Sequence, residues 1–390
     1  IIDMALVCVF PKKQSITGED LVELHLHGSI AVIDELFLFF SSIKELRPAE
    51  PGEFTKRALI NGKMDITEVE GLADLLASET KQQRIQSIKL LKGELSEKYA
   101  HWRQKLIKAR AEMEALLDFS DEGDVSQNAN DSSFVKIISG LINEIEKDLV
   151  RGIAGERLRK GLKIALVGAP NVGKSSLINL LLKEDRAIVS ASAGTTRDTI
   201  EARVNLEGVP VTLYDTAGIR ETNDEIEKEG VLRSKSIAEE ADIILNIWDS
   251  SADLKEKTID LSNNKFSRII NVYNKADLIE EKSYINKKGF NISCKTRQGI
   301  ESFIEGLGAE VKNLTSLSDM TVGPNRIRHI NHLNETKESL ELALKEAKTG
   351  KIEISADFIR AASASLGRIV GSVDIEDVLD EIFLGFCIGK

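Results

Sequence analysis

The feature that most limits the fold of this chain is an eight-residue loop, Gly168-Ala-Pro-Asn-Val-Gly-Lys-Ser175. It follows a predicted strand at 164–167 and opens a predicted helix at 175–182. The pattern G-x-x-x-x-G-K-S in that context lets backbone N–H groups surround phosphate oxygens at a helix N-terminus. Lys174 can then reach the β- and γ-phosphates, and Ser175 can bind Mg²⁺. The sequence therefore predicts a P-loop nucleotide site.

Further apolar runs alternate with helical stretches after this loop. They lie at 211–214, 243–248, 269–273 and 290–292. Strands that alternate with helices form a doubly wound, mostly parallel sheet. We therefore expect an α/β domain around the P-loop.

The segments on either side of this domain have other textures. Thr67 and Glu70 indicate a capping box, and apolar residues then recur every three or four positions over 88–116, which predicts one long amphipathic helix. A second helix is expected to end near Leu149, and the pattern is helical again after about Asn313. Residues 1–62 mix short apolar runs with Gly and Pro, as an α+β domain does.

The predicted fold is multidomain, with a P-loop α/β domain inserted into an all-α helical domain and preceded by a truncated α+β domain. The expected limits are 1–62 for the α+β domain, 63–159 and 313–390 for the two halves of the helical domain, and 160–312 for the inserted domain. The chain opens on Ile1 without a Met, so we expect that an N-terminal piece is missing.

Composition excludes several classes of function. The 52 Lys and Arg against 63 Asp and Glu give a net charge of −11, which argues against a dedicated non-specific nucleic-acid binder. The three widely spaced cysteines exclude a disulfide framework and suit a reducing cytosol. No apolar run is long enough to cross a membrane. We expect a cytoplasmic protein with no membrane partner.

Basic residues are nevertheless concentrated at 81–110. This segment contains nine Lys or Arg and two acidic residues, which gives a local net charge of +7. A solvated helix face usually explains such an excess. A stripe that contacts RNA phosphates is the rival interpretation, and it predicts salt-dependent affinity.

The base of the nucleotide is predicted by Asn274-Lys-Ala-Asp277, at the end of a predicted strand. The Asp277 carboxylate can accept two hydrogen bonds from the N1–H and exocyclic amine of guanine. Adenine lacks this pair of donors and would leave a buried carboxylate unpaired. The segment Ser293-Cys-Lys295 resembles a loop that touches guanine through its backbone. The predicted ligand is therefore GTP.

Two further motifs belong to the phosphate side of the site. Asp215, in Asp215-Thr-Ala-Gly218, can hold Mg²⁺ through water, and the Gly218 N–H can meet the γ-phosphate. Gly194-Thr-Thr-Arg-Asp198 supplies candidate switch threonines. Ser175 and Thr196 are the predicted Mg²⁺ ligands. The predicted GTP-binding residues are Asn171, Val172, Gly173, Lys174, Ser175, Ser176, Thr195, Thr196, Asp215, Thr216, Ala217, Gly218, Asn274, Lys275, Asp277, Ser293, Cys294 and Lys295.

The residue that orients the attacking water is less evident. Ile219 follows the Asp215 motif where a Gln would be expected, and its side chain cannot orient water. The acidic stretch 221–229 offers carboxylates or is a solvated switch loop. Arg197 and Arg220 are either catalytic cations or partners of neighbouring acids.

Several motifs together resemble the tRNA-modification GTPase family MnmE, also called TrmE. They are the P-loop with Asn171, the Gly194-Thr-Thr-Arg-Asp198 segment, Thr17-Gly-Glu-Asp20 with His25-Leu-His-Gly28, Pro51-Gly-Glu-Phe-Thr-Lys-Arg-Ala58 and the ending Phe386-Cys-Ile-Gly-Lys390. The resemblance covers essentially the whole chain. It implies action on the wobble uridine of tRNA together with the FAD-dependent partner MnmG (GidA). The implied product carries an aminomethyl or carboxymethylaminomethyl group, with 5,10-methylene- or 5-formyl-tetrahydrofolate as the one-carbon donor.

The resemblance also implies roles for particular residues. Glu227 would orient water, and Cys387 would be a functional thiol, although most such cysteines are small buried hydrophobes. The N-terminal domain would form a homodimer, and GTP and K⁺ would pair the GTPase domains. The implied K⁺ ligands are Asn171, Ser190, Ser192 and Thr195, and the implied folate contacts are Glu23, Lys63 and Lys390.

Two alternatives stay open. The chain could be a regulatory RNA-binding GTPase switch of the ribosome-assembly type, without modification chemistry; the Phe386–Lys390 ending and the 17–58 motifs favour the modifying enzyme. His25 and His27 have metal-compatible spacing, but without a third ligand a structural or pocket-lining role is favoured over zinc.

Overall fold

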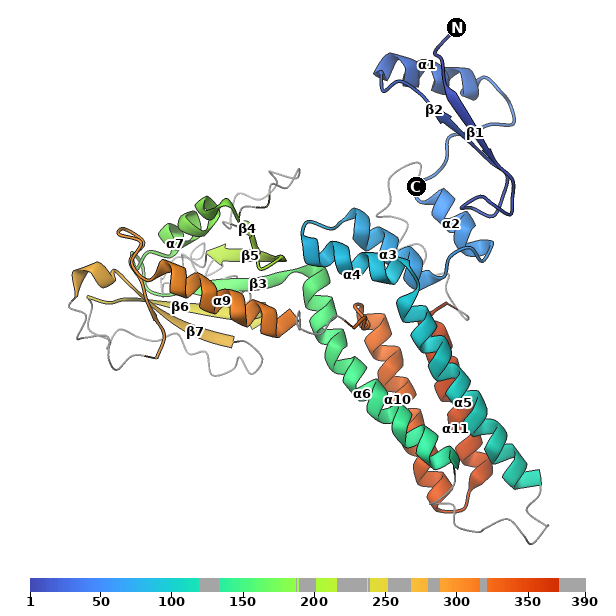
Figure 1. Cartoon of the computed structure of the whole chain (residues 1–390). Helices are drawn as coiled ribbons and strands as arrows, with labels where there is room; N and C mark the ends of the chain where they lie inside the picture. Colours follow the sequence, from blue (N-terminus) through green and yellow to red (C-terminus); the bar gives the residue numbers. More distant parts are fainter. Residues whose placement is uncertain are drawn as a thin grey trace, which may run out of the picture. The chain divides into compact units, whose positions relative to one another are not determined.

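The computed structural model describes residues 1–118, 133–186, 188, 201–215, 237, 239–251, 268–279, 288–315 and 321–371. The chain divides into two compact units (Figure 1). Unit 1 comprises Ile1–Ala77, Ile85–Val150 and Val322–Lys390. Unit 2 comprises Ser78–Arg84 and Arg151–Thr321. Unit 2 is thus built mainly from one continuous segment flanked on both sides by segments of unit 1.

Unit 2 contains a six-stranded sheet with the strand order β4-β5-β3-β6-β7-β8. All neighbours pair in parallel except β4 and β5, which are antiparallel. The strands are β3 (Leu162–Val167), β4 (Glu201–Leu206), β5 (Val209–Asp215), β6 (Ile243–Asp249), β7 (Arg268–Asn274) and β8 (Phe290–Asn291). The expected doubly wound, mostly parallel sheet is confirmed.

Helices α7 (Lys174–Leu181) and α9 (Ile300–Thr315) pack on this sheet, and a π-helical turn (Leu182–Arg186) follows α7. Strand β3 is central and almost wholly buried, so its apolar residues form a continuous run, as in a strand covered on both faces. The core joins side chains of β3, β5 and β6 to Leu177 and Leu181 of α7 and to Phe303 and Leu307 of α9. This packed core holds the carboxyl ends of the parallel strands in fixed positions.

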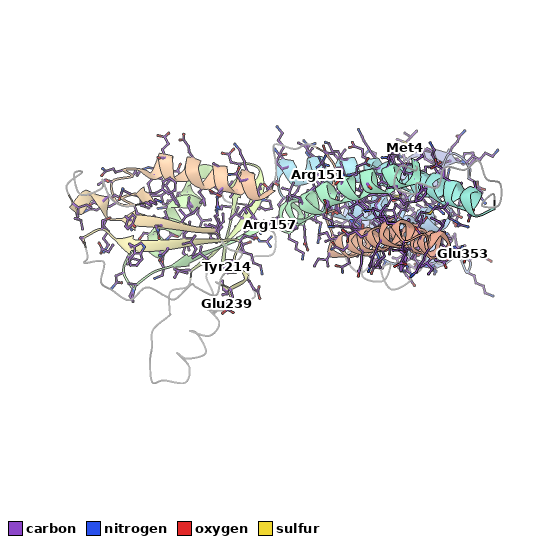
Figure 2. All side chains as sticks on the ribbon, turned by 90° about the horizontal axis from the view of Figure 1, so that it is seen from below. Met4, Arg151, Arg157, Tyr214, Glu239 and Glu353 are labelled. Atoms are coloured by element: carbon purple, nitrogen blue, oxygen red, sulfur yellow. The ribbon has the colours of Figure 1, made fainter. Side chains whose placement is uncertain are left out.

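The last part of helix α6 (Ser133–Lys160) belongs to unit 2. Arg157 belongs to this last part of α6 and is labelled in Figure 2. Its Nε donates to Oδ1 of Asp242, the residue just before β6, at 2.9 Å. The first turn of α4 (Lys81–Leu91) also belongs to this unit, since Gln83 Nε2 donates to Arg159 O at 2.9 Å. Helix α6 extends beyond the end predicted near Leu149.

Unit 1 has a helical core. Helices α5 (Glu94–Asp118), α10 (Ile327–Lys348) and α11 (Ile352–Ile369) run alongside the first part of α6 as a bundle (Figure 1). The predicted apolar spacing is confirmed by burial: Leu95, Tyr99, Leu106, Ala109 and Met113 are each at most 1% exposed. These side chains recur at three- and four-residue spacing, so they form one face of α5.

The single long helix expected over 88–116 is wrong, because α4 ends at Leu91 and α5 begins at Glu94. Gly93 has φ 78°, and a Cβ there would lie 2.9 Å from Glu68 Oε1. Only glycine adopts this conformation without strain. The apolar spacing continues through the break, so periodicity alone did not reveal it.

Helix α3 (Ile66–Leu76) begins with a capping box, but the predicted residues were wrong. The N-cap is Asp65, whose Oδ1 accepts from the N–H of Thr67 and Glu68, and Glu68 Oε2 accepts from the Asp65 N–H at 2.8 Å. Glu70 instead points into unit 1, where it is 1% exposed.

Residues 1–62 contain strands β1 (Leu6–Phe10) and β2 (Leu21–His25), which pair antiparallel, and helices α1 (Ile30–Ser41) and α2 (Glu53–Ile60). This is the predicted mixture of α and β elements. Many large apolar side chains here are exposed, among them Leu6, Val9, Val22, Phe37 and Leu38. Among the described residues, no helix combines the length and the apolar character that crossing a membrane requires.

Candidate guanine nucleotide site

The P-loop lies between β3 and α7, as predicted. Gly173 has φ 103°, and a Cβ there would overlap the Asn274 amide nitrogen. A glycine is therefore required by both conformation and space. Helix α7 begins directly afterwards at Lys174, within one residue of the prediction. Its first backbone N–H groups have no partners within the helix, which makes this end suited to phosphate.

Lys174 lies along the loop. Its Nζ donates to the carbonyl oxygens of Gly168 at 2.8 Å and Ala169 at 3.0 Å. Burial lowers the pKa of Lys174, and the nearby carboxylate of Asp215 opposes this shift. The Lys174 ammonium group is thus held by carbonyl oxygens of the P-loop, in the region where the motif predicts that phosphate binds.

Ser175 and Asp215 meet at the end of β5. Ser175 Oγ donates to Asp215 Oδ2 at 2.6 Å. The other oxygen, Oδ1, is buried and has no hydrogen-bond partner within the described residues. A buried carboxylate oxygen without a donor is unfavourable unless a ligand satisfies it. A hydroxyl and an acidic oxygen together are donors that Mg²⁺ prefers, so these residues fit the predicted cation.

Asn274 connects the two loops that the sequence predicted to surround the nucleotide. Its Nδ2 donates to the Val172 carbonyl at 2.7 Å, and its Oδ1 accepts from the Cys294 N–H at 3.2 Å. Asn274 is 4% exposed, so both bonds are shielded from water. The P-loop and the 293–295 loop are therefore fixed relative to one another.

The residues predicted to read the base lie next to this contact. Asp277 Oδ1 accepts from Ser293 Oγ at 2.6 Å, and Ser293 Oγ also accepts from the Thr296 N–H at 3.1 Å. Burial raises the pKa of the Cys294 thiol to about 11, so this cysteine is present as the thiol near neutral pH. That state fits the predicted role through backbone rather than side chain.

Asp249 was not identified from the sequence. It lies at the end of β6, beside β7, and its Oδ2 accepts from Lys275 Nζ at 2.6 Å. Lys275 has φ 61°, so the contact holds a residue of uncommon backbone conformation. Its position could have indicated it, because β6 ends at Asp249 and the neighbouring strand β7 ends at Asn274.

Three predicted site residues are exposed, and others lie outside the described part of the chain. Asn171 lies in the P-loop with φ 61°, Ser176 lies in α7, and Lys295 lies in the 293–295 loop. The following predicted residues lie outside the described part of the chain: Ser190, Ser192, Thr195, Thr196, Thr216, Ala217, Gly218, Glu227, Cys387 and Lys390.

The N-terminal candidates make local contacts. Glu23 Oε2 lies 3.2 Å from His25 Nε2, and His27 Nδ1 lies 2.9 Å from Asp3 Oδ1. Lys63 Nζ donates to the Lys13 carbonyl at 3.0 Å. No group of three or more His, Cys, Asp or Glu arranged for a metal occurs in the described ranges. The structure does not bring Glu23 and Lys63 into direct contact with each other.

These contacts define the class of the protein. A P-loop that opens α7, a Ser175–Asp215 pair and an Asn274 side chain that joins the P-loop to the 293–295 loop make unit 2 a P-loop GTPase unit.

Comparison with known proteins identifies the family. Two family models cover nearly the whole chain: "GTP-binding protein TrmE N-terminus" matches residues 1–63, and "MnmE helical domain" matches residues 66–387. A tRNA modification GTPase MnmE of Agrobacterium fabrum is 42% identical over 390 residues, covering 100% of this chain and 87% of the relative. One of Bradyrhizobium sp. is 43% identical over 392 residues, with the same coverage of 100% and 87%. The chain belongs to the MnmE family.

Solved structures are similar over part of the chain. The GTPase Era of Aquifex aeolicus, bound to GDP·AlF4⁻, is 25% identical and covers 46% of this chain and 67% of its own, with a TM-score of 0.33. The G domain of the T. maritima FeoB transporter is 23% identical and covers 38% and 98%, with a TM-score of 0.29.

Proposed function

We propose that this chain hydrolyses GTP and that the reaction drives the modification of a tRNA wobble uridine. Membership of the MnmE family supports the class of reaction. The observation that carries the GTPase part is the buried Asp215 Oδ1, which lies beside Ser175 and lacks a donor among the described residues.

Mg²⁺ is the proposed occupant of this position, held by Ser175 and Thr196 and, through water, by Asp215. When bound, Mg²⁺ neutralises charge on the β- and γ-phosphate oxygens. Lys174 binds the same phosphates, and the first N–H groups of α7 orient them. Asn274 keeps the base-reading loop in register with the P-loop.

Guanine specificity is tested by Asp277→Asn. The variant can no longer accept two hydrogen bonds from guanine, but its amide can donate to the C2 carbonyl of xanthine. We expect GTP affinity to fall by at least about a thousandfold and xanthosine triphosphate to become the better ligand. Asp242→Asn, far from the base-reading loop, is the control. An unchanged preference for GTP over xanthosine triphosphate would contradict the assignment of Asp277.

Hydrolysis is proposed to need K⁺ and Glu227. Asn171, Ser190, Ser192 and Thr195 are the proposed K⁺ ligands, and the cation supplies positive charge where the transition state spreads negative charge. The test compares turnover in KCl and NaCl for the parent chain, Glu227→Ala and the control Glu229→Ala. Equal rates in both salts, or an unimpaired Glu227→Ala variant beside Glu229→Ala, would refute this part.

The modification is proposed to use Cys387, a tetrahydrofolate and the flavoprotein partner MnmG. Glu23 and Lys63 are exposed, so their charged groups are accessible to a polar ligand such as folate, with Lys390 as a third contact. Folate binding is measured by calorimetry on Lys63→Ala, with the exposed Lys56→Ala as control. Equal affinity in both variants would exclude Lys63.

The decisive experiment on the modification is mass spectrometry of wobble uridines in tRNA from cells that carry only Cys387→Ser. We expect loss of the modified nucleoside with GTP turnover retained, whereas Cys8→Ser keeps both. Retention of both by Cys387→Ser would exclude its role. GTP-dependent RNA binding without any modified nucleoside in the parent strain would favour the regulatory switch instead.

A homodimer is proposed through the N-terminal domain, with additional pairing of GTPase units in the presence of K⁺ and nucleotide. Sedimentation with GDP and aluminium fluoride in KCl against NaCl tests the second contact. Identical sedimentation in the two salts would argue against it.

A further inference from the structure

A groove with a charged rim lies between two helices of unit 1. Helices α5 and α11 pack side by side (Figure 1), and the cavity along them has a volume of about 310 Å³. We call it the α5–α11 groove. Its lining residues are Arg103, Leu106, Ile107 and Arg110 from α5, and Ile359, Arg360, Ser363, Ala364 and Gly367 from α11.

The floor of the groove is apolar and closely packed. Leu106 is 0% exposed and Ile359 is 1% exposed, so both belong to the core of the bundle. Ala364 and Gly367 have little or no side chain, which leaves space above this floor. Ile107 is 53% exposed and extends the apolar surface outward. A volume near 300 Å³ is at the lower limit of small-molecule sites.

The rim carries three guanidinium groups. Arg103 is exposed and has no hydrogen-bond or ion-pair partner among the described residues. Arg110 Nε donates to Glu114 Oε1 at 2.7 Å, and Arg360 Nη1 donates to Asp357 Oδ1 at 3.0 Å. Both pairs are exposed, so they contribute little and compete weakly with another anion. Each arginine retains free N–H groups.

The groove includes only part of the basic stripe predicted over 81–110, namely Arg103 and Arg110. Lys98 of that stripe donates to Asp148 and to the Val322 carbonyl, and Lys105 donates to both oxygens of Glu144. These lysines are therefore engaged inside unit 1. Arg103 and Arg110 face the groove instead, where α11 adds Arg360, a residue that is remote in the sequence.

We infer that the α5–α11 groove binds RNA, with its arginines on a backbone phosphate and its apolar floor against the ribose or base of the adjoining nucleotide. This inference rests on the proposed function, which makes tRNA the substrate. The planar guanidinium group matches phosphate oxygens with two parallel hydrogen bonds. Unpaired nucleotides in RNA loops offer a phosphate and an apolar face together, the same combination that the groove presents.

The charge of the chain favours this occupant. A protein of net charge −11 repels RNA over most of its surface, so binding needs a local excess of positive charge. The groove concentrates three arginines from two helices around one apolar site. An acidic protein segment would also be attracted by charge, but its carboxylates are not joined to an apolar ring in every residue, as a phosphate is joined to a ribose and base in every nucleotide.

The test is tRNA binding by the full-length chain carrying Arg103→Ala and Arg360→Ala together. Fluorescence anisotropy at several salt concentrations gives the affinity and its salt slope. We expect at least about a tenfold loss of affinity, and a slope of log K against log salt that falls by about 0.7–0.9 for each phosphate that the variant no longer binds. Lys108→Ala, exposed on α5 but outside the groove, should change affinity by less than about twofold.

A second variant separates charge from geometry. Arg103→Lys keeps the charge and loses the planar fork, so we expect an intermediate affinity with an almost unchanged salt slope. Both arginines are exposed, and thermal unfolding verifies that the variants fold as the parent does. Unchanged affinity and salt slope in the double variant would overturn the inference. A loss of affinity without a change of slope in that variant would also overturn it, because its arginines would then not have been bound to phosphate.

Failure of the inference and failure of the proposed function have different signatures. If the parent chain binds tRNA and the double variant binds it equally well, only the groove assignment fails. If the parent chain shows no tRNA affinity, with or without a GTP analogue, the proposed function fails and this inference with it. GTP hydrolysis by the double variant should equal that of the parent in every case, since neither arginine is part of the nucleotide site.

Discussion

Two buried carboxylates, one from each unit, have opposite patterns of hydrogen bonding. Glu70 of α3 is 1% exposed, and Asp215 of β5 is 6% exposed. Glu70 Oε1 accepts from Arg328 Nε at 2.8 Å, and Oε2 lies 2.9 Å from His329 Nε2. Asp215 has one such bond, from Ser175 to Oδ2, and its Oδ1 has no donor within the described residues.

The number of paired oxygens distinguishes the two carboxylates. Both oxygens of Glu70 have partners, as in a structural role, whereas one oxygen of Asp215 is left for a ligand. Burial raises the pKa of Glu70, but His329 and Arg328 outweigh burial, so the pKa lies well below its ordinary value. Arg326 adds a further ion pair at 3.3 Å. A fully paired group like this stabilises one arrangement of α3 and α10, whereas a half-paired group gains most from an incoming cation.

The largest expected effect is that of Glu70→Gln. It removes the charge that compensates Arg326 and Arg328, so unit 1 should lose about 3–5 kcal/mol of unfolding free energy. Trp102 lies in the core of unit 1, and fluorescence of a Trp248→Phe background reports its urea unfolding alone. Glu335→Gln, which alters an exposed contact, should cost less than about 1 kcal/mol. Equal effects of the two changes would refute the structural role of Glu70.

Asp215→Asn should show the reverse behaviour. Because Oδ1 has no partner to lose, amide hydrogen exchange of β3 should show a stability change of less than about 1 kcal/mol. GTP hydrolysis should fall by on the order of a hundredfold, because the proposed Mg²⁺ loses an anionic partner. Asp242→Asn, which breaks an ion pair elsewhere in unit 2, should leave turnover unchanged. A large loss of stability with normal turnover in Asp215→Asn would overturn the comparison.

Contiguous motifs made the nucleotide site predictable. The P-loop, Asp215, and the segments at 274–277 and 293–295 each lie at or just after the end of a strand, and a parallel sheet brings strand ends to one edge. The order of these segments along the chain was therefore enough to predict that they lie close together in the fold. The structure joins the P-loop and the 293–295 loop through Asn274, at positions where short loops leave little freedom.

Strand β4 was missed for a local reason. Its sequence Glu-Ala-Arg-Val-Asn-Leu alternates polar and apolar residues, and it lies at the sheet edge outside the parallel pattern. Glu207 and Gly208, with φ 56° and 85°, form the two-residue turn to β5. Such a turn favours an antiparallel hairpin, so it could have indicated a strand before β5. An interpretation based only on alternating strands and helices does not include that strand.

The start of α3 shows what a sequence pattern cannot decide. Asp65 with Glu68, and Thr67 with Glu70, both match the capping-box spacing. The first pair forms the box, because Glu70 is bound by Arg328 and His329, which lie more than 250 residues later in the chain. Tertiary contacts at that distance have no local signature. The domain limits drawn at residues 62, 159 and 312 stay predictions.

The pH dependence of unit 1 provides a finer test of the cluster around Glu70. Burial lowers the pKa of His329, and Glu70 only partly opposes this. Below about pH 6.5 the unfolded chain therefore binds a proton that the folded chain does not, so stability should fall as the pH drops from 7.5 to 5.5. Glu70 stays ionised over this window, because its folded pKa is lowered and its own contribution is lost only below about pH 4.

His329→Gln should remove this part of the pH dependence, while the exposed His101→Gln should retain it. The measurement is the urea midpoint at pH 7.5, 6.5 and 5.5, reported by Trp102. Each unit by which the folded pKa of His329 lies below its ordinary value corresponds to about 1.4 kcal/mol at most. An unchanged pH profile in His329→Gln would mean that the buried histidine does not limit the stability of the cluster.

The smallest expected effect is at Asp249, which combines the two cases because it is saturated but lies at the nucleotide site. Burial raises its pKa, but hydrogen bonds from Lys275 and Ser251 outweigh burial and lower it. The side chains of Lys275 and Asp249 are 34% and 19% exposed, so the pair should contribute less than about 1 kcal/mol.

Asp249→Asn should therefore weaken GTP binding by less than about fivefold, through a looser Lys275, and leave maximal turnover unchanged. Nucleotide binding and steady-state kinetics distinguish the two quantities, and Ser251→Ala, which removes only one donor to Asp249, is the control. If Asp249→Asn instead lowered hydrolysis as strongly as Asp215→Asn, closeness to the site, rather than an unpaired oxygen, would decide which carboxylates act on GTP. If Asp249→Asn had no effect on GTP affinity, Asp249 would be a structural carboxylate although it lies at the nucleotide site. Asp249 and Asp215 would then show, within unit 2 alone, the same contrast that Glu70 and Asp215 show between the two units.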